Sequence, residues 1–281
     1  MSLPPLHVPE LLRQFGLHPD KRLGQNFLID PAALNRIVEA ASVSLQDAIL
    51  EVGPGLGSLT RLLAIQARQV VAVELDSRLV PALEEVLAPY PNTRVVQGDI
   101  LDLNPAELMA GEPGYLVVAN IPYYITSALI RHLLESNVKP QRLVITVQRE
   151  VAERVTAPPG ELSLLALSVQ VYGQPRIMAH IPAGAFYPAP KVDSAVVRVD
   201  LYSEPRIPSG LLPDFFRLAK AGFSQKRKTM RNALAGGMHW SPQQAADILA
   251  SIGIDPRRRA ETLSLEEWEK LVDRYRLQVE S

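Results

Sequence analysis

The sequence predicts an α/β fold with a doubly wound, mostly parallel sheet, followed by a small all-helical C-terminal domain. Short apolar runs alternate with helix-forming segments between residues 48 and 148, which is typical of repeated strand–helix units. The first run ends in glycines at positions 53, 55 and 57, so the chain is expected to turn sharply into the next helix. Beyond residue 210 the apolar spacing is helical throughout.

The segment 1–45 precedes the sheet. It is Pro-rich at first, with one short helix expected around Val8–Phe15, and it continues into a polar, basic stretch at 21–28. Asp30 followed by a proline is typical of a helix N-cap with Pro at the first helical position. A helix is therefore expected from there to about Ala41.

Strands and helices then alternate regularly. The elements expected are strands near 48–52, 70–74, 94–97, 116–120 and 142–148, and helices near 58–67, 77–87 and 125–135. The strands are short and apolar, as expected when helices cover both faces of a parallel sheet. The binding site of such a sheet lies at the carboxyl ends of its strands.

The remainder of the chain closes the sheet and adds the helical domain. The runs Arg176–Ile181 and Ser194–Leu201 have strand character and are expected to form a hairpin at one sheet edge. A linker-like stretch at 203–210 predicts a first domain of residues 1–204 and a second of 205–281. Helices are expected in the second domain at about 213–222, 227–235, 242–252 and 264–276.

Composition excludes several classes of function. The 281 residues contain no cysteine, and the five histidines are scattered without metal-ligand spacing, so neither a disulfide nor a metal site is expected. The N-terminus lacks the apolar core of a signal peptide, and no apolar run is long enough to span a bilayer. A cytoplasmic protein with no membrane partner is expected, and nothing indicates obligate self-association, so we expect a monomer.

The glycine turn and the acid at the next strand end indicate a nucleotide site. Glu74 ends the second apolar run, where a carboxylate can reach a ribose diol beside the first strand. A turn with no ligand is the alternative, since many α/β proteins have one. The spacing Gly-x-Gly-x-Gly departs from the dinucleotide pattern Gly-x-Gly-x-x-Gly, which argues against a bound pyrophosphate and a nicotinamide dehydrogenase. It favours a ligand without phosphates that lies flat across the strand ends.

Two further strand ends carry polar residues. Asp99 follows the third strand and can accept a hydrogen bond from an exocyclic amine, or alternatively cap a turn. The stretch Asn120–Tyr124 follows the fourth strand and offers an amide oxygen, a backbone carbonyl stiffened by Pro122, and an aromatic face at Tyr123. Two acceptors can draw the amine nitrogen of a base toward sp³ geometry and free its lone pair. The ring of Tyr123 can stack on the same base.

Asn120–Tyr123 is similar to the Asn-Leu/Ile-Pro-Tyr motif of S-adenosylmethionine-dependent methyltransferases that act on ribosomal RNA adenines. Over nearly its whole length the chain resembles the family of small-subunit ribosomal RNA adenine N6,N6-dimethyltransferases. The stretches that carry the resemblance are Gly24–Leu28, Glu51–Gly57, Val73–Asp76, Gly98–Asp99 and Asn120–Tyr123, and, more specific to this family, Phe186–Ser194, Phe223–Asn232 and Arg259–Glu261. The resemblance implies a Rossmann-like methyltransferase fold for residues 1–204, with the segment 1–45 facing the cofactor and the RNA, and a helical RNA-binding domain at 205–281. It also implies S-adenosylmethionine as the cofactor.

The resemblance also implies roles for individual residues. Asn26 and Leu28 would close over the cofactor, and Gly53 with Gly55 would pass beneath its methionine part. Glu74 would bind the ribose, Asp99 with Ile100 would bind the adenine, and Leu75 would also belong to the cofactor site. The residues expected to act on the target base are Asn120, Pro122, Tyr123 and Phe186, with Asn120 also touching the cofactor and Phe186 forming the opposite wall of the base slot. The Tyr-Gly-x-Leu-Ser turn often found in the family is replaced by Pro159–Ser163, with a shortened loop at 157–161, so contacts made by that turn are not carried over to this chain.

Basic residues are concentrated at the C-terminal end. Residues 205–281 hold 13 Lys and Arg against 9 Asp and Glu, whereas residues 1–204 hold 16 against 21. Arg227 and Arg231 are expected to share one helix face at i,i+4. The residues expected to contact RNA phosphates are Lys21, Arg22, Lys191, Lys226, Arg227, Lys228 and Arg231; a solvated helix face is the alternative.

The reaction implied is dimethylation of N6 on each of two adjacent adenosines near the 3′ end of small-subunit (16S-type) ribosomal RNA, coupled to ribosome biogenesis. The partner would be that RNA in an immature small subunit. One alternative is the related macrolide-resistance class that methylates an adenine of large-subunit RNA, which shares Asn120–Tyr123 but should lack the motifs at 186–194 and 226–232. Another is a mainly nonenzymatic assembly factor.

Overall fold

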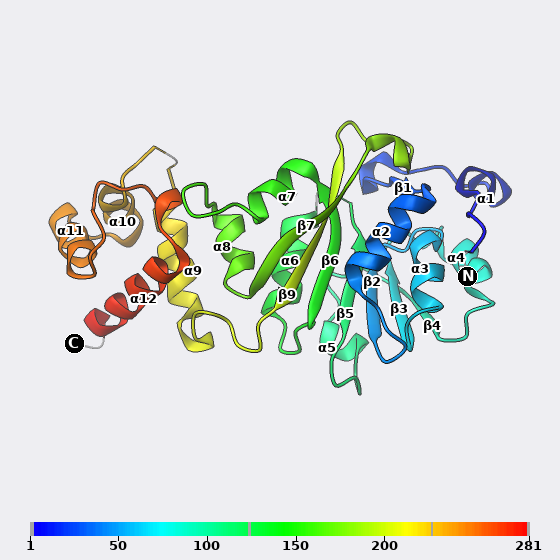
Figure 1. Cartoon of the computed structure of the whole chain (residues 1–281), viewed down its shortest axis with the longest axis horizontal. Helices are drawn as coiled ribbons and strands as arrows, with labels where there is room; N and C mark the ends of the chain where they lie inside the picture. The colour runs from blue at the N-terminus through cyan, green and yellow to red at the C-terminus, as the bar shows by residue number, and fades with distance from the viewer. Residues whose placement is uncertain (1–2, 123–124, 226, 280–281) are drawn as a thin grey trace. The chain divides into compact units, whose positions relative to one another are not determined.

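The computed structural model describes residues 3–122, 125–225 and 227–279, which form two compact units (Figure 1). One unit comprises the chain up to Ala152 together with Pro175–Leu201, and the other comprises Glu153–Gln174 and the chain from Tyr202 onward. The second unit therefore includes residues 153–174, which the sequence-based boundary at residue 204 places in the first domain. The assignment of separate functions to the two domains stays a prediction.

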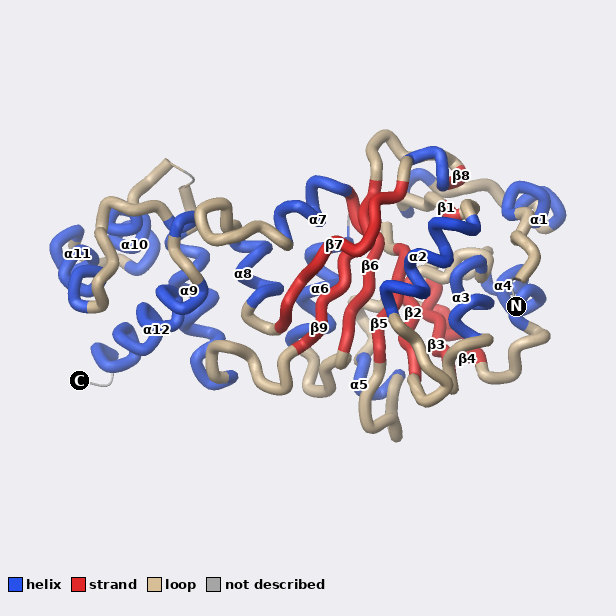
Figure 2. Tube along the Cα trace, in the orientation of Figure 1, coloured by secondary structure: helices blue, strands red, loops and turns tan. Residues whose placement is uncertain are grey.

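A seven-stranded sheet forms the centre of the first unit, in the order β4-β3-β2-β5-β6-β9-β7 (Figure 2). Its strands are β2 (Ala48–Val52), β3 (Gln69–Glu74), β4 (Thr93–Gln97), β5 (Leu116–Asn120), β6 (Arg142–Gln148), β7 (Gly173–Ile181) and β9 (Ser194–Leu201). The first five strands pair in parallel and β9 runs antiparallel to β6. The five expected strands and the edge position of the last two are confirmed.

The strand order places a topological switch point between β2 and β5. From β2 the chain continues outward on one side through β3 and β4, and it then returns to pair β5 with the other side of β2. Helices that follow strands on the two sides of such a point leave in opposite directions and open a crevice at the strand carboxyl ends. The ends of β2 and β5, at Val52 and Asn120, border this crevice.

Helices cover both faces of the sheet. Those wholly within the first unit are α1 (Val8–Gln14), α2 (Pro31–Ala41), α3 (Ser58–Ala64), α4 (Val80–Leu87), α5 (Pro105–Leu108) and α6 (Thr126–Glu135), whereas α7 (Arg149–Val155) crosses the boundary after Ala152. The α2 and α3 helices lie on the near face in Figure 1 and α6 on the far face. The expected cap of α2 is confirmed, because the carboxylate of Asp30 accepts hydrogen bonds from the backbone N–H groups of Ala32 and Ala33.

Apolar burial beneath α2 and α3 holds these elements in place. Ile37 of α2, Ile49 of β2 and Leu63 of α3 are fully buried in one cluster with residues of β5, β6 and β9. Each such side chain contributes about 1.5–3 kcal/mol on burial. The same cluster takes in Leu28 and Phe186, so the core reaches the short two-stranded sheet formed by β1 (Phe27–Leu28) and β8 (Phe186–Tyr187). This second sheet joins the N-terminal segment to the loop before β9.

The second unit is helical. It contains α8 (Leu164–Gln170), α9 (Leu212–Gly222), α10 (Met230–Met238), α11 (Pro242–Ser251) and α12 (Leu265–Val279). The fully buried indole of Trp268 stands edge-on to the ring of Phe215 at 6.4 Å and stacks on Phe223 at 6.0 Å. The ring also lies against Gly222, where any side chain would collide with it. Within the described residues, no helix is long and apolar enough to cross a membrane.

One expected helix starts later than the sequence indicated. The helix expected at 227–235 begins at Met230, because Thr229 has the extended backbone of an N-cap residue. Arg227 lies in the preceding turn. The expectation that Arg227 and Arg231 share one helix face is therefore wrong.

Candidate active site

Four neighbouring strands end at one cavity. The turns that follow β2, β3, β4 and β5 all contribute to its wall, and the N-terminal segment and β8 complete the wall. The cavity residues that the sequence analysis singled out are Asn26, Leu28, Gly53, Gly55, Glu74, Leu75, Asp99, Ile100, Asn120, Pro122 and Phe186. The structure thus brings together every described residue expected at the cofactor and the target base. Tyr123, the expected stacking residue, lies outside the described residues.

The glycine turn after β2 lines this cavity. Gly53 and Gly55 have φ values of 71° and 59°, in the left-handed region that residues with a Cβ rarely adopt. A Cβ on Gly55 would lie 3.0 Å from the ring of Phe27, and a Cβ on Gly53 would lie 3.6 Å from the carbonyl oxygen of Asn120. The turn therefore packs closely against both the N-terminal segment and the end of β5. Phe27 is a cavity residue that received no role from the sequence.

Glu74 is held by backbone donors at the end of β3. Its Oε2 accepts from Gly55 N at 3.0 Å and its Oε1 accepts from Asp76 N at 2.8 Å. Only 5% of the residue is exposed, and burial raises the pKa of its carboxyl to about 7, against the opposing effect of backbone hydrogen bonds, chiefly those from Asp76 and Gly55. Each oxygen keeps a further lone pair, so the ionised group can still accept two hydroxyl hydrogens.

Glu51 places a second buried carboxyl at the same cavity. It is 1% exposed, and its Oε2 has no hydrogen-bond partner among the described residues. Burial raises the pKa of this carboxyl to about 8, so the group is largely neutral at pH 7. Glu51 has no separate role predicted from the sequence, because an acid within an apolar strand carries no signal of its own.

The wall at the end of β4 combines one acid with apolar side chains. The Oδ1 of Asp99 accepts from the backbone N–H of Leu101 at 2.9 Å, so this residue caps a turn, as the alternative interpretation proposed. Its side chain also lines the cavity, and its other oxygen has no hydrogen-bond partner in the described part of the chain. Leu75, 39% exposed, and the buried Ile100 line the cavity nearby and offer apolar surfaces to a flat ring.

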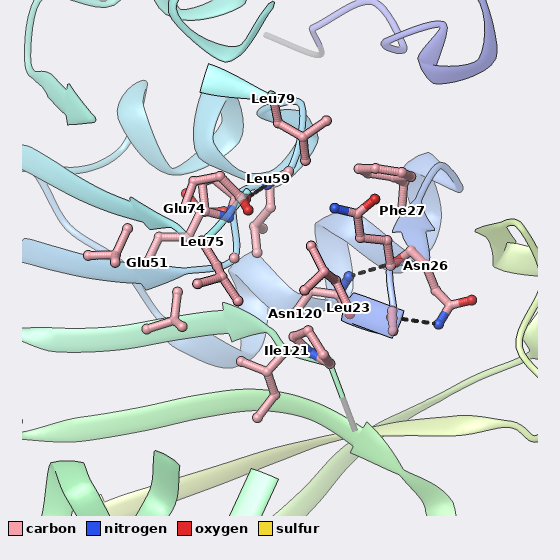
Figure 3. Close-up of a pocket in the computed structure, with 18 of the residues that line it drawn as sticks. Leu23, Asn26, Phe27, Glu51, Leu59, Glu74, Leu75, Leu79, Asn120 and Ile121 are labelled. Carbon is pink, nitrogen blue, oxygen red and sulfur yellow. Dashed lines mark hydrogen bonds between the residues drawn. The ribbon is translucent and has the colours of Figure 1, made fainter. Parts of the chain in front are cut away.

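The side chain of Asn120 has a defined orientation. Its Nδ2 donates to the backbone carbonyl of Asn26 at 3.3 Å, and the Nδ2 of Asn26 donates to the carbonyl of Gly24 at 3.0 Å (Figure 3). A flipped Asn120 amide would set its Oδ1 against the Asn26 oxygen, two acceptors facing each other. The amide oxygen of Asn120 is therefore the atom left to accept a hydrogen from another group.

A polar network ties the N-terminal segment to the loop after β3. Gln25 Nε2 donates to Asp76 Oδ2 at 2.8 Å, and Gln25 Oε1 accepts from Asp20 N at 2.8 Å. Arg78 bridges the carboxylates of Asp76 and Asp20 at 2.7 and 3.3 Å. The hydrogen bond from Arg78 lowers the pKa of the Asp76 carboxyl, so this acid is ionised at neutral pH. Gln25 and Asp76 have no individual role predicted from the sequence, although both lie inside stretches that carry the family resemblance.

Basic residues expected at the RNA are exposed. Lys21, Arg22 and Lys191 are exposed in the first unit, and Arg22 forms an ion pair with Asp20 at 2.9 Å. Among those of the second unit, the exposed described members are Arg227, Lys228 and Arg231, whereas Lys226 lies outside the described residues.

The fold joins two basic stretches of the second unit. Met230 N donates to the carbonyl of Arg258 at 2.7 Å, and Arg231 N donates to the carbonyl of Pro256 at 3.1 Å. These bonds place the stretch 227–231 beside 257–259. They also occupy the first two backbone N–H groups of α10. Within the described ranges, no three His, Cys, Asp or Glu side chains are grouped as metal ligands would be.

Known families and proteins resemble this chain over most of its length. The family described as ribosomal RNA adenine dimethylase matches residues 17–277. The ribosomal RNA small subunit methyltransferase A of Dehalococcoides mccartyi strain CBDB1 is 48% identical over 267 residues, which cover 95% of this chain and 91% of that protein. The protein of the same name from Bacillus licheniformis is 40% identical over 281 residues, covering 97% and 96%.

Two crystal structures share the architecture. A dimethyladenosine transferase from Plasmodium falciparum aligns with a TM-score of 0.77 and 25% identity over 90% of this chain and 98% of that one. The 23S rRNA methyltransferase ErmE aligns with a TM-score of 0.71 and 30% identity over 89% and 99%. The Rossmann-like α/β fold expected from the sequence is confirmed.

Proposed function

Because this chain belongs to the ribosomal RNA adenine dimethylase family, we propose that it dimethylates N6 of two adjacent adenosines near the 3′ end of small-subunit ribosomal RNA. It is an S-adenosylmethionine-dependent ribosomal RNA adenine dimethyltransferase. The observation that carries the proposal is the convergence of Glu74, Asp99 and Asn120 on one cavity at the switch point of the sheet. That cavity combines a ribose acceptor, an amine acceptor and the proposed catalytic amide.

The side chains around the cavity fit S-adenosylmethionine. Glu74 can accept both ribose hydroxyls, and the remaining oxygen of Asp99 can accept from the adenine amine. Gly53 and Gly55 line the cavity and have no Cβ, so a ligand can lie against their backbone. When bound, the cofactor supplies a methyl group on a sulfonium, which needs no further activation.

Asn120 would prepare the target amine. Its Nδ2 is occupied by the carbonyl of Asn26, so its Oδ1 would accept one N–H of the adenine N6. The backbone carbonyl of Ile121, stiffened by Pro122, would accept the other, and together they would free the nitrogen lone pair. Phe186 would form one wall of the slot, and Tyr123 would stack on the base, worth about 1–3 kcal/mol. We assign no general base, because the proton of the methylated amine can pass to water.

The target base must leave its stack to reach this slot. Exposed cations would hold the folded RNA by its phosphates without reading its sequence. The joined basic stretches of the second unit, with Lys228 and Arg231 exposed, support this surface. Arg258 is better explained as structural, because its guanidinium bonds Glu267 and Thr262.

Small-subunit RNA is proposed as the substrate because the relatives named for that activity are 40–48% identical over nearly the whole chain. The second candidate, methylation of a large-subunit adenine, is favoured by the likeness to ErmE at 30% identity. We further propose that the protein acts as a monomer in the cytoplasm on an immature small subunit, as part of ribosome biogenesis. A mainly nonenzymatic assembly factor would not need the cofactor and slot residues found together at this cavity.

Mass spectrometry of methylated RNA tests the proposal. Purified protein and S-adenosylmethionine are incubated with small-subunit particles from cells that lack these methyl groups, and with matching large-subunit particles. Two adjacent N6,N6-dimethyladenosines near the 3′ end of the small-subunit RNA are expected. Methylation of the large-subunit RNA alone would favour the second candidate, and methylation of neither RNA would contradict both.

A further inference from the structure

The side-chain amide of Gln25 holds the N-terminal segment in place through both its nitrogen and its oxygen. Its nitrogen donates to Asp76 and its oxygen accepts from Asp20 N, each at 2.8 Å. The residue is half-buried and lines the same cavity as Asn120. Asp76 is 6% exposed and is itself held by Arg78, so it is a fixed anchor for Gln25.

The Gln25–Asp76 hydrogen bond links two residues of the proposed reaction, Glu74 and Asn120. On one side, Asp76 N donates to Glu74, the proposed ribose acceptor, at 2.8 Å. On the other side, Gln25 is followed by Asn26, whose carbonyl accepts from Asn120 at 3.3 Å. The position of the Asn26 carbonyl, and with it the orientation of the Asn120 amide, therefore depends on where Gln25 holds the backbone.

The Asn26–Asn120 hydrogen bond is sensitive to small displacements. At 3.3 Å it is already longer than the usual range for an N–H···O bond, so a shift of a few tenths of an ångström would break it. Without that bond, no other hydrogen bond to the described residues holds the Asn120 oxygen rather than its nitrogen toward the slot. An Asn120 nitrogen facing the adenine N6 would be a donor facing a donor.

We propose that Gln25 is a positioning residue for methyl transfer: its bond to Asp76 holds the carbonyl of Asn26 where that carbonyl orients the Asn120 amide. This inference rests on the proposed function, since it concerns the rate of that reaction. Gln25 does not touch the reacting atoms and acts through Asn26.

An exchange of charge between Gln25 and Asp76 tests the inference. The variants are Gln25→Glu, Asp76→Asn and the double variant. Gln25→Glu sets two carboxylates against each other, and Asp76→Asn leaves one oxygen where two accepted, so Gln25 and Arg78 compete for it. In the double variant the amide introduced at position 76 can donate to the carboxylate introduced at position 25. The other oxygen of that carboxylate still accepts from Asp20 N, so the donor–acceptor match between positions 25 and 76 is restored, while Arg78 keeps one oxygen at position 76.

The readouts are the single-turnover methylation rate on small-subunit particles, the dissociation constant of S-adenosylmethionine and the thermal midpoint. Each single variant is expected to lose about 10- to 100-fold in rate, as misplacement of a reacting group does, with a smaller change in cofactor affinity. The double variant is expected to recover most of the rate, a coupling that independent sites do not show. Gln66→Glu is the matched control, because this half-buried amide of the same unit donates to the Leu62 carbonyl, away from the cavity.

Unchanged rates in the single variants would overturn the inference, and so would a double variant whose loss equals the product of the two single losses. Equal losses in rate and in cofactor affinity would also overturn it, since they would indicate a loosened cofactor site. If Gln25→Glu does not fold, Gln25→Ala removes the bond without repulsion and should lower the rate in the same way. A wild-type protein that methylates no RNA would instead contradict the proposed function.

Discussion

At the scale of single residues, the function depends on which atom of a side chain remains free. Asn120 uses its nitrogen within the protein and keeps its oxygen for the slot. Glu74 uses one lone pair of each oxygen for backbone donors and keeps the others. The sequence names the residue types, but only the hydrogen bonds of the folded chain decide which atoms are still available.

Replacing Asn120 by Ala should abolish most of the methyl transfer. The variant loses the amide oxygen proposed to activate the adenine amine, and loss of one such polar group typically costs about 100- to 1,000-fold in rate. S-adenosylmethionine binding should fall far less, because Glu74 and Asp99 are untouched. Single-turnover rates and equilibrium binding measure the two effects, and equal losses in both would contradict the proposed role of Asn120.

Cofactor affinity should depend on pH near neutrality. Burial raises the pKa of Glu74 to about 7, and the ionised form accepts both ribose hydroxyls, so binding favours loss of the proton. The affinity is therefore full above pH 7 and should weaken as the pH falls below 7, by a factor that approaches tenfold per pH unit. Calorimetric titration between pH 6 and 8 measures this slope. Glu74→Gln should bind more weakly with a flatter profile, and an unchanged profile in that variant would assign the titration to another group.

At the scale of elements, the turn after β2 is shaped by what packs on it. Gly55→Ala should lower the free energy of unfolding, by about 1–2 kcal/mol for the left-handed backbone, and should weaken cofactor binding through the contact with Phe27. Gly16→Ala is the matched control, because Gly16 has a similar φ of 65° but open space around it. Denaturant unfolding and cofactor titration of both variants separate backbone strain from the contact. If Gly16→Ala weakened cofactor binding as much, the contact with Phe27 would not be the cause.

Two adjacent arginines of the second unit should differ in their contribution to stability. Arg258 bonds Glu267 and Thr262, whereas the side chain of Arg257 is 88% exposed and pairs with Asp255. Arg258→Ala should cost about 1–3 kcal/mol, as expected for lost hydrogen bonds to charged groups. Arg257→Ala should leave the denaturant midpoint unchanged, because exposed ion pairs contribute little to the free energy of unfolding. Denaturant titration of both variants checks this, and equal losses in the free energy of unfolding would contradict the structural role assigned to Arg258.

At the scale of the whole molecule, charge is distributed unevenly along the chain, although the formal net charge is only −1. Replacing Arg227 and Arg231 together by Ala should weaken RNA binding and reduce the slope of log K against log salt by about 2, one for each lost phosphate contact. Lys270→Ala, an exposed lysine of α12, is the control. Binding measured across a salt series tests this, and an unchanged slope in the double variant would indicate that the RNA binds to another surface.

Much of the molecule could be predicted from the sequence because the signals are local. The five strands, the Asp30 cap of α2 and the late helices follow from apolar spacing and from turn residues that act over a few positions. Glu74, Asp99 and Asn120 could be expected at one edge because parallel strands end on the same side of a sheet. The predicted start of α10, at residue 227 instead of Met230, was wrong because the backbone bonds of Met230 and Arg231 to the 256–258 loop could not be seen in the sequence.

The sequence by itself determined the fold class, the order of the strands along the chain and the residue types at each strand end. Only the tertiary structure decided that Gln25 and Asp76 meet, that Phe27 packs on the glycine turn, and that the Asn26 carbonyl takes the nitrogen of Asn120. The physical reason is range: helix and strand patterns arise from neighbours along the chain, whereas the last of these contacts joins residues 94 positions apart. Such contacts exist only after the chain has folded and the entropy cost of bringing those residues together has been met.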